Sequence, residues 1–270
     1  SVLLFMRSMN RSLVRNRSTA ESLPSRRIYA AADEDRLRPL RARITVLELE
    51  GALFFGSADR VAELADVLDA GCHTLVLDFR RVGLIDESGV VVLTQMARRL
   101  QDRGTRLLLA GVGANNRHGR MLQQFAGKRF ANDHGAADVE QAVEIAELQL
   151  LAEAGFEPLR ETVPIEQVSL MDGLDAAQRT RLAACLRPTR LASGEVLFRR
   201  GDPGDQLFVI TAGSINVFSG EHPASDTLPQ RFVSISPGMM LGETAMLDGR
   251  GRSGDAVAFG ETEVHALDDS

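Results

Sequence analysis

The fold of the C-terminal half is decided by Gly194-Glu-Val-Leu-Phe-Arg-Arg-Gly-Asp-Pro-Gly-Asp205, which continues as Gln206-Leu-Phe-Val-Ile-Thr-Ala-Gly-Ser-Ile-Asn-Val217. Short apolar runs alternate here with turns that contain glycine, which is the pattern of two β-hairpins. Further short apolar segments follow at Phe232–Ile235, Ala256–Phe259 and Val264–Leu267. Short strands with glycine turns between them predict an antiparallel barrel or sandwich.

Residues 44–154 alternate between strand-like and helix-like patterns instead. Apolar and β-branched runs predict buried strands, and apolar residues at helical spacing predict helices between them. The predicted strands are Ile44–Leu49, Thr74–Asp78 and Thr105–Ala110, and the predicted helices are Ala58–Leu68 with Ser57 as its cap, Val90–Leu100, Arg120–Phe125 and Ala137–Ala154. Strands separated by helices favour an α/β sandwich with parallel neighbouring strands and right-handed crossovers.

Length and composition agree with two domains. The chain has 270 residues, of which 44% are hydrophobic and 25% charged, the balance of a folded globular protein. We predict a basic leader and linker over 1–43, the α/β domain over 44–154, a connector over 155–172 and the β-rich domain over 173–270.

Composition also excludes several classes of function. The formal net charge of −6 argues against nucleic-acid binding, and no apolar run reaches the roughly 18–20 residues that span a bilayer. Cys72 and Cys185 stand alone in the sequence, so neither a disulfide scaffold nor a zinc site is indicated. No P-loop, Gly-x-Ser-x-Gly or His-Glu-x-x-His motif occurs, so we predict no enzyme, no catalytic residue, no metal and no cofactor.

The predicted leader is basic. Val2–Met6 is apolar, and residues 1–30 carry a single acid, Glu21, against Arg7, Arg11, Arg15, Arg17, Arg26 and Arg27. An apolar stub followed by arginines is typical of the cytoplasmic end of a transmembrane helix, where positive residues lie near anionic headgroups. The alternative is a disordered basic leader.

A first group of polar side chains lies in the loop Leu84-Ile-Asp86-Glu-Ser88-Gly89, which joins a strand to the helix Val90–Leu100. Asp86 and Ser88 can cap the free N–H groups at the start of the helix. Because a helix start also favours anions, Asp86, Ser88 and Gly89 form a corner that can hold a phosphate, or gain one by phosphorylation of Ser88. The alternative is that these residues only cap the helix.

The run Ile44–Ala154, with Asp86-Glu-Ser88-Gly89 between a strand and the next helix, resembles a STAS domain. That family includes anti-sigma-factor antagonists and the cytosolic tails of SulP-type anion transporters. Its best-known members are phosphorylated on the serine of an Asp-x-Ser-Gly loop, and Ser88 falls at that position. The stretch Leu47–Asp59 is similar to the SulP version, in which a Phe-Phe-Gly turn, here Phe54-Phe-Gly56, precedes the first helix.

The SulP resemblance extends backward through the leader, because in that family the STAS domain directly follows the last membrane helix. The resemblance implies that the partner is the membrane-embedded transport domain of the same polypeptide and that the protein is a homodimer. It also implies a place at the cytoplasmic face of the bacterial inner membrane, as part of an integral membrane protein.

The spacing of the second region, Val168–Ser270, resembles a cyclic-nucleotide-binding domain, a jelly-roll type of barrel. The resemblance implies a phosphate-binding cassette over Leu241–Val257, in which Glu243 accepts from the ribose 2′-hydroxyl and Arg252 grips the cyclic phosphate. The candidate residues for cAMP or cGMP are Gly242, Glu243, Thr244, Ala245, Arg252, Ser253 and Asp255. The alternative is a surface arginine and a capping glutamate in a degenerate loop.

This cassette departs from the family pattern. The family has Arg-Ala-Ala-Thr or Arg-Ser-Ala-Thr where this chain has Arg252-Ser-Gly-Asp255, so a carboxylate replaces a hydroxyl and repels an anionic ligand if it faces it. Gly251 replaces the usual proline. The family also places lid helices after the last strand, and the chain stops at Ser270, soon after Val264–Leu267.

Together the two resemblances predict the cytosolic regulatory module of a SulP-like membrane anion transporter, such as a sulfate transporter. Its STAS domain assembles with the transport domain, and its second domain senses a cyclic nucleotide. Two alternatives remain open. One is a soluble STAS partner-switch or scaffold protein regulated by phosphorylation of Ser88, and the other is the regulatory tail of a soluble enzyme.

Overall fold

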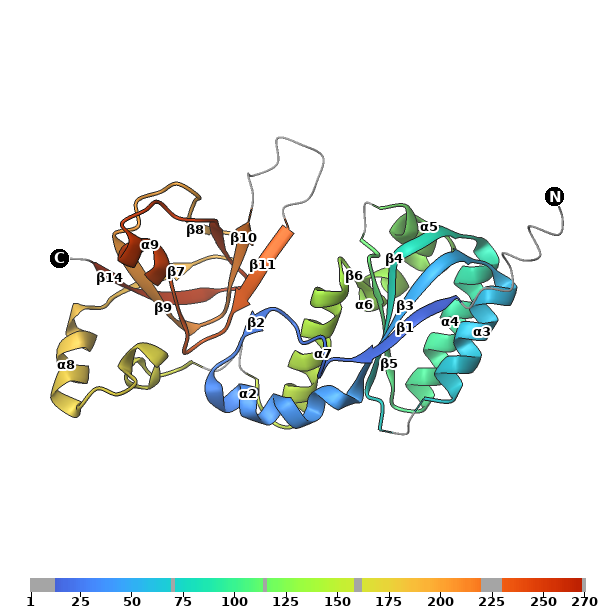
Figure 1. Cartoon of the computed structure of the whole chain (residues 1–270), viewed down its shortest axis with the longest axis horizontal. Helices are drawn as coiled ribbons and strands as arrows, with labels where there is room; N and C mark the ends of the chain where they lie inside the picture. The colour runs from blue at the N-terminus through green and yellow to red at the C-terminus, as the bar shows by residue number, and fades with distance from the viewer. Residues whose placement is uncertain (1–12, 69–70, 114–115, 158–161, 220–229, 269–270) are drawn as a thin grey trace. The chain divides into compact units, whose positions relative to one another are not determined.

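The computed structural model describes residues 13–68, 71–113, 116–157, 162–219 and 230–268 (Figure 1). The chain forms two compact units. The first comprises Ser1–Ser25 and Leu37–Leu150, and the second comprises Arg26–Arg36 and Leu151–Ser270. The chain therefore passes from one unit to the other after Ser25, after Arg36 and after Leu150.

The first unit is built on a mixed sheet of order β1-β3-β4-β5-β6. Its strands are β1 (Val14–Thr19), β3 (Ile44–Leu53), β4 (Thr74–Ile85), β5 (Arg106–Ala110) and β6 (Gly135–Ala136). The strands from β3 to β6 run parallel, and β1 pairs antiparallel with β3. The predicted α/β sheet with parallel neighbouring strands is confirmed.

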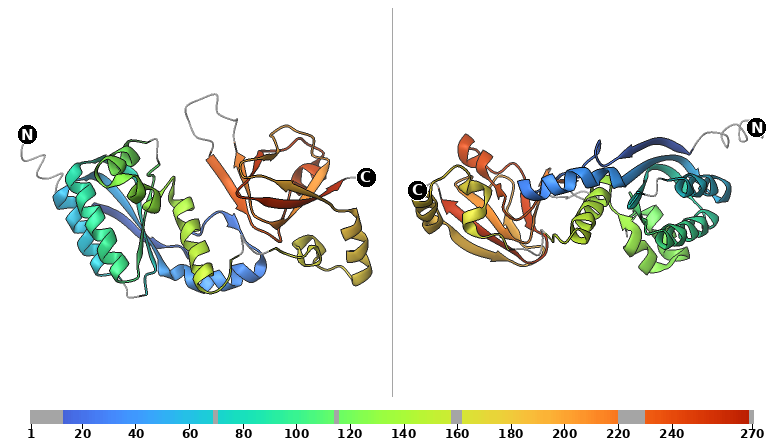
Figure 2. Two further views of the ribbon diagram at one scale, coloured as in Figure 1. Left: turned by 180° about the vertical axis from the view of Figure 1, so that it is seen from behind. Right: turned by 90° about the horizontal axis from the view of Figure 1, so that it is seen from below.

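Helices cover both faces of this sheet (Figure 2). One face carries α3 (Phe55–Asp66), α4 (Glu87–Asp102), α5 (Arg117–Phe125) and α6 (Gly127–His134), and the other carries α7 (Val139–Glu153). Side chains alternate along each strand, so Leu47 and Leu49 enter the first core while Ile44 and Val46 pack against α7. Helix α3 begins three residues before the predicted start. The Ser57 hydroxyl lies inside its first turn and accepts from the N–H of Phe54.

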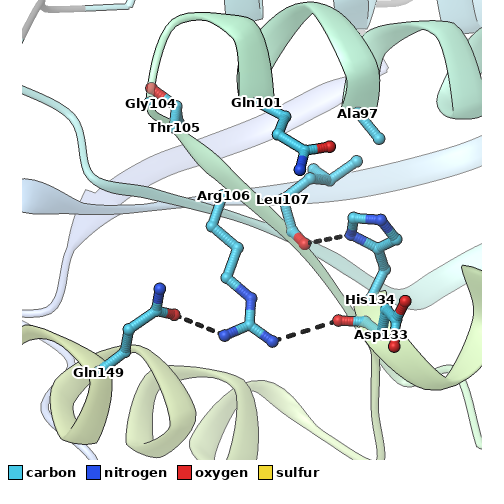
Figure 3. Close-up of a pocket in the computed structure, with 9 residues that line it drawn as sticks. All are labelled: Ala97, Gln101, Gly104, Thr105, Arg106, Leu107, Asp133, His134 and Gln149. Carbon is cyan, nitrogen blue, oxygen red and sulfur yellow. Dashed lines mark hydrogen bonds between the residues drawn. The ribbon is translucent and has the colours of Figure 1, made fainter. Parts of the chain in front are cut away.

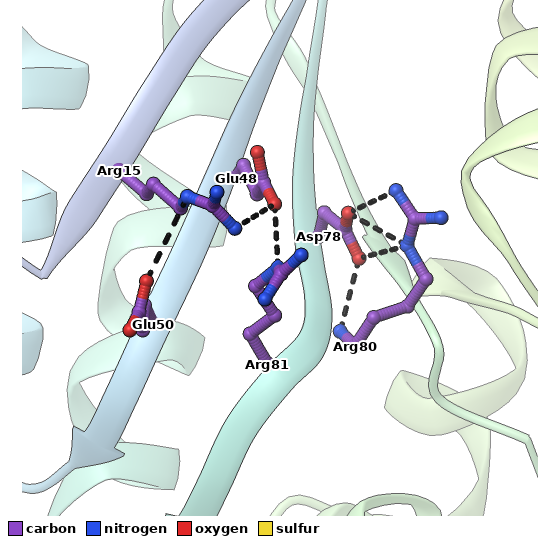
Figure 4. Close-up of polar contacts among 6 residues, drawn as sticks. All are labelled: Arg15, Glu48, Glu50, Asp78, Arg80 and Arg81. Atoms are coloured by element: carbon purple, nitrogen blue, oxygen red, sulfur yellow. Dashed lines mark hydrogen bonds and ion pairs between the residues drawn. The ribbon is translucent and has the colours of Figure 1, made fainter.

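Where strands β1, β3 and β4 lie side by side, they carry a cluster of charged side chains (Figure 4). Arg81 Nε lies 2.9 Å from Glu48 Oε1, and Arg15 Nη1 approaches the same oxygen at 3.4 Å. Arg80 pairs with the buried Asp78 at 2.8 Å, and this hydrogen bond raises the pKa of Arg80. The exposed pairs of Glu48 with Arg81 and Arg15 contribute about 0–1 kcal/mol each.

Residues 13–43 differ from the predicted leader and linker. They contain β1, β2 (Arg27–Ile28), α2 (Ala31–Leu37) and the 3-10 helix η1 (Arg38–Arg43). Strand β1 has the sequence Val-Arg-Asn-Arg-Ser-Thr, an edge strand whose arginines face solvent, so it lacks the apolar alternation that predicts a strand. The predicted apolar stub Val2–Met6 and the arginines Arg7 and Arg11 lie outside the described residues.

The second unit contains two sheets, of order β2-β11-β10-β13-β8 and β12-β9-β14-β7. All pairings are antiparallel among the described strands except that of β2 with β11, in agreement with the predicted barrel or sandwich. The strands are β7 (Arg187–Leu191), β8 (Val196–Phe198), β9 (Gln206–Ala212), β10 (Ile215–Ser219), β11 (Gln230–Ile235), β12 (Met240–Leu241), β13 (Asp255–Ala258) and β14 (Thr262–Asp268).

Helices flank these sheets. The short helix α9 (Glu243–Asp248) joins β12 to β13. The predicted connector and the start of the β-rich domain contain η2 (Ile165–Gln167), η3 (Ser169–Met171) and α8 (Ala176–Cys185). Val168, Met171 and Leu186 form a small apolar cluster with Val209 of β9, so this stretch is packed against the sheets. None of the helices in the described part of the chain combines the length and apolar character needed to cross a bilayer.

Candidate functional site

The loop between β12 and β13 brings several predicted ligand residues together. Gly242 caps α9 in the left-handed conformation (φ 90°), which L-residues rarely adopt. A Cβ built on Gly242 would lie 2.6 Å from Nη1 of Arg252, so the missing side chain also makes room for the guanidinium. The start of α9 and Arg252 are therefore fitted to one another.

Arg252 is buried, with 4% of its surface exposed. Its Nη1 donates to the carbonyl of Gly242 at 3.0 Å, and its Nη2 donates to the carbonyl of Gln206 at 2.7 Å. The guanidinium carbon lies 4.5 Å from the centre of the Phe198 ring and 5.5 Å from that of Phe208. Its Nε is buried and has no hydrogen-bond partner in the described structure. A buried cation with an unused donor is suited to an anion.

Burial lowers the pKa of Arg252, and the charges of Asp205 and Asp202 partly offset this effect. The guanidinium stays charged near neutral pH, because an arginine titrates far above that range. Its backbone is also fixed, since the N–H of Arg252 donates to Asp202 and its carbonyl accepts from Gly201, both at 2.9 Å. The β8–β9 turn thus holds Arg252 in place.

The remaining predicted ligand residues lie around α9. Glu243 is the first residue of the helix and is half-buried, and its Oε1 accepts from the Thr244 hydroxyl at 3.2 Å. Ala245 is buried against Gly204, where an added Cβ would come within 2.6 Å of the alanine methyl. Thr244 and Ser253 are exposed. Within the described residues Glu243 forms no ion pair with Arg252, so its carboxylate stays available to another donor.

The carboxylate of Asp255 is held by the backbone of the neighbouring turn. Its Oδ1 accepts from the N–H of Arg200 at 2.7 Å, and the residue is buried at the start of β13. The carboxylate therefore fastens the end of β8. Gly254 beside it leaves no room for a Cβ, which would lie 2.4 Å from the carbonyl oxygen of Phe218. Gly254 and Asp255, which replace the alanine and threonine of the family pattern, thus have local structural reasons.

A second predicted site is assembled at the start of α4. The Asp86 carboxylate caps the helix, with Oδ1 accepting from the N–H of Gly89 at 2.8 Å and from the Ser88 hydroxyl at 2.7 Å. The same Ser88 oxygen accepts from the N–H of Phe55 at 2.9 Å. Two helices, α3 and α4, therefore begin beside Ser88, and their N-termini favour negative charge there.

Metal binding finds no support in the described residues, which contain no group of three or more histidine, cysteine or acidic side chains able to hold an ion.

The family model for the STAS domain matches residues 38–125, and that for the cyclic nucleotide-binding domain matches residues 188–270. The chain holds a STAS domain followed by a cyclic nucleotide-binding domain. The Ser88 corner belongs to the STAS domain, and the Gly242–Arg252 contact belongs to the cyclic nucleotide-binding domain.

Relatives match the two domains to different extents. A protein named Glutaminase 2 from Bradyrhizobium diazoefficiens is 27% identical over 259 residues, which are 91% of this chain and 38% of that protein. The cAMP-dependent protein kinase regulatory subunit of Dictyostelium discoideum is 32% identical over 104 residues, 38% of this chain and 32% of that protein. Among solved structures, the regulatory domain of Toxoplasma gondii PKA with cAMP is 26% identical over 38% of this chain and 39% of that one, with a TM-score of 0.36. The chain spans about 38% of the length of the first relative.

The residues that hold Arg252 in the cyclic nucleotide-binding domain were not predicted. Phe198 and Phe208 were part of the hairpin pattern, but their role under the guanidinium depends on the pairing of β8 with β13 and of β9 with β12. The contact with Gln206 is made by its carbonyl, so no side-chain pattern could signal it. The contact of Arg200 with Asp255 is also made through the backbone.

Proposed function

We propose that this chain is a regulatory module whose cyclic nucleotide-binding domain binds a cyclic nucleoside monophosphate at Arg252. The observation that carries the proposal is the buried, charged guanidinium of Arg252, which has an unused Nε donor and lies against the start of α9. These residues fit an anionic phosphate. A carboxylate that would repel it, Asp255, is instead bonded to the backbone of Arg200.

Each residue has a role in this proposal. Arg252 supplies charged N–H donors to the phosphate, and Glu243 accepts from the ribose hydroxyl. Gly242 keeps the space that the guanidinium occupies. Binding can shift the module between two conformations only if the ligand has a higher affinity for one of them. In this proposal the STAS domain responds to that shift.

We propose further that the module regulates an enzyme of the glutaminase type. The similarity to Glutaminase 2 runs through 91% of the chain and so through both domains, whereas the kinase regulatory subunit matches 38%. The two domains are of regulatory kinds. In this proposal the hydrolysis of glutamine belongs to the part of such a protein that this chain does not cover. The favoured parent protein is therefore an enzyme, and this chain is its regulatory tail.

A SulP-like anion transporter is the second candidate parent. It is favoured by the Phe54-Phe-Gly56 turn at the start of α3 and by the arginines among residues 1–30. In that protein the module would form a homodimer at the cytoplasmic face of the membrane. The gene upstream of Ser1 distinguishes the two parents. A catalytic domain supports the enzyme, and a series of apolar segments of about 20 residues supports the transporter.

Ser88 is a candidate phosphorylation site in either parent, and mass spectrometry of the native protein tests it.

Cyclic-nucleotide binding is tested by calorimetric titration of cAMP and cGMP onto the 270-residue chain. We expect saturable binding, with affinity at least tenfold lower in Arg252→Gln, because a hydrogen bond to a charged group contributes about 1.5–3 kcal/mol. Arg250→Gln, an exposed neighbour, is the matched control and should bind normally. Glu243→Gln changes a partly exposed side chain, so it should weaken binding without loss of folding. No heat from either nucleotide at millimolar concentration would contradict the proposal.

A further inference from the structure

A cavity of about 410 Å³ lies in the STAS domain, at the end of the sheet where β5 begins (Figure 3). It is bounded by the end of α4, the end of α6 and the middle of α7, through Gln101, His134 and Gln149. The Ser88 corner follows the carboxyl end of β4. Because β4 and β5 run parallel, this cavity lies at the amino ends of the strands and that corner lies at their carboxyl ends. The cavity is therefore a separate place on the domain.

One wall of the cavity is cationic. Arg106, the first residue of β5, donates from Nη1 to Gln149 Oε1 at 2.5 Å and from Nη2 to the backbone oxygen of Asp133 at 3.3 Å. Both acceptors are neutral, and the ion pairs found among the described residues do not include Arg106. A guanidinium has five N–H donors, so three remain for a ligand. A cation held by neutral oxygens is prepared to bind a carboxylate in a bidentate way.

The opposite wall accepts hydrogen bonds. His134 Nδ1 lies 2.8 Å from the carbonyl oxygen of Leu107, so Nδ1 carries a proton, and in the tautomer that this bond selects Nε2 is an acceptor. The Asp133 carboxylate lines the mouth beside this ring, with Oδ2 at 3.5 Å from Arg129. Helices α4 and α6 both end here, and the C-terminal end of a helix favours positive charge.

The lining thus pairs one cation, Arg106, with one carboxylate, Asp133, and places the amides of Gln101 and Gln149 between α4 and α7. A simple anion would satisfy Arg106 but would face Asp133 and two helix C-termini. A simple cation would face Arg106. A molecule that carries both charges satisfies both walls, and a volume of about 410 Å³ is in the range of roughly 300–1,000 Å³ of small-molecule pockets.

We propose that this cavity binds a free polar α-amino acid as a zwitterion. Arg106 takes its carboxylate, the Asp133 carboxylate and His134 Nε2 take its ammonium group, and the glutamine amides contact its polar side chain. The inference does not depend on nucleotide binding by the other domain, because every residue involved belongs to the STAS domain.

The test is a thermal-shift screen of the 270-residue chain against the standard L-amino acids, followed by calorimetry of those that raise the melting temperature. Succinate, which has no ammonium group, and inorganic phosphate are the comparison ligands. We expect a polar amino acid to bind at least tenfold more tightly than either. Equally tight binding of succinate or phosphate would show that the ligand is a simple anion and would overturn the zwitterion proposal. If no amino acid binds at about 10 mM, the proposed site is wrong.

Three variants locate the site. Arg106→Gln should reduce the affinity at least tenfold. Arg99→Gln, on the face of α4 that pairs with Asp66, should leave it unchanged. Gln149→Glu places a carboxylate on Arg106 and should abolish binding without lowering the melting temperature, so it remains informative if Arg106→Gln folds poorly. Normal amino-acid binding by folded Gln149→Glu would overturn the proposal.

Discussion

Gly242 combines two requirements in one residue. Its backbone is left-handed, and its missing side chain leaves room for the Arg252 guanidinium. Gly249, at the other end of α9, is also left-handed (φ 62°), but a Cβ there would meet nothing within 4 Å. An alanine at either position strains the backbone, but only an alanine at Gly242 also displaces Arg252, so comparing the two substitutions separates these effects.

We expect Gly242→Ala to weaken cyclic-nucleotide binding at least tenfold, and Gly249→Ala to leave the affinity within about threefold of the wild type. Both variants should lower the melting temperature of the cyclic nucleotide-binding domain, since a left-handed L-residue costs about 1–2 kcal/mol. Calorimetric titration with cAMP gives the affinities, and scanning calorimetry gives the stabilities. Equal affinities in the two variants would show that the space beside Arg252 is unimportant.

Helix α5 contains a histidine whose burial predicts that the STAS domain is sensitive to acid. His118 lies in its first turn, with the edge of Phe79 at a centroid distance of 6.0 Å and a buried Nδ1 that has no partner among the described residues. Burial lowers the pKa of His118, and the charge of Arg117 lowers it further, while a backbone interaction with Val82 opposes them. The folded domain therefore holds the neutral ring.

The unfolded chain binds this proton more readily, because its histidine has the ordinary pKa of about 6.5. The stability that the neutral ring contributes is present above that pH and is lost as the pH falls below it. We expect His118→Phe to reduce the drop in melting temperature of the STAS domain between about pH 7.5 and 5.5. His265→Phe, in the other domain, should leave that drop unchanged. The comparison is made by scanning calorimetry at both pH values, and an undiminished drop in His118→Phe would refute the assignment.

At the scale of elements, the sequence predicted those whose side chains show a clear pattern. Strand β5 begins one residue after its predicted start and ends at the predicted Ala110, because an apolar run marks it. Strand β7 was not predicted, since Arg187-Pro-Thr-Arg-Leu191 is polar and its partner β14 lies about 70 residues away in the chain. Strand β2 has two residues and exists only through its pairing with β11.

The candidate sites follow the same division. Asp86 and Ser88 were predicted to act together because they are neighbours at a helix start, and the structure brings them together. The Arg252 position followed from the cassette pattern. The bond from the backbone of Arg200 to Asp255 and the amino-acid cavity around Arg106 were not predicted, because each joins residues that are distant in sequence and have no pattern in common.

Considered as a whole molecule, the chain contributes its N-terminal segment to both domains. In the STAS domain, Glu147 of α7 is fully buried and accepts from the Ser25 hydroxyl and from Arg41 Nε, the latter at 2.7 Å. In the cyclic nucleotide-binding domain, the buried Arg27 donates to the hydroxyls of Ser214 and Ser236 at 2.9 and 3.2 Å. A single residue of sequence, Arg26, thus lies between an anchor in one domain and an anchor in the other.

These anchors predict that single substitutions in the N-terminal segment act on different domains. We expect Arg41→Ala to destabilise mainly the STAS domain, by about 3–5 kcal/mol, because it removes a cation from the buried carboxylate of Glu147. Arg27→Ala should lower mainly the free energy of unfolding of the cyclic nucleotide-binding domain, by about 1.5–3 kcal/mol, because hydrogen bonds from a charged donor are lost. Arg26→Ala, exposed beside Arg27, is the control and should change either transition by less than about 1 kcal/mol.

Scanning calorimetry of the 270-residue chain measures both transitions, and cAMP identifies the second one if it binds, since a ligand raises only the transition of the domain that holds it. A segment that was only a leader would leave both transitions unchanged in Arg27→Ala and in Arg41→Ala. A chain shortened to begin at Leu37 tests both domains at once. It lacks β1 beside β3 and β2 beside β11, so one sheet in each domain loses an edge strand, and the melting temperatures of both domains should fall.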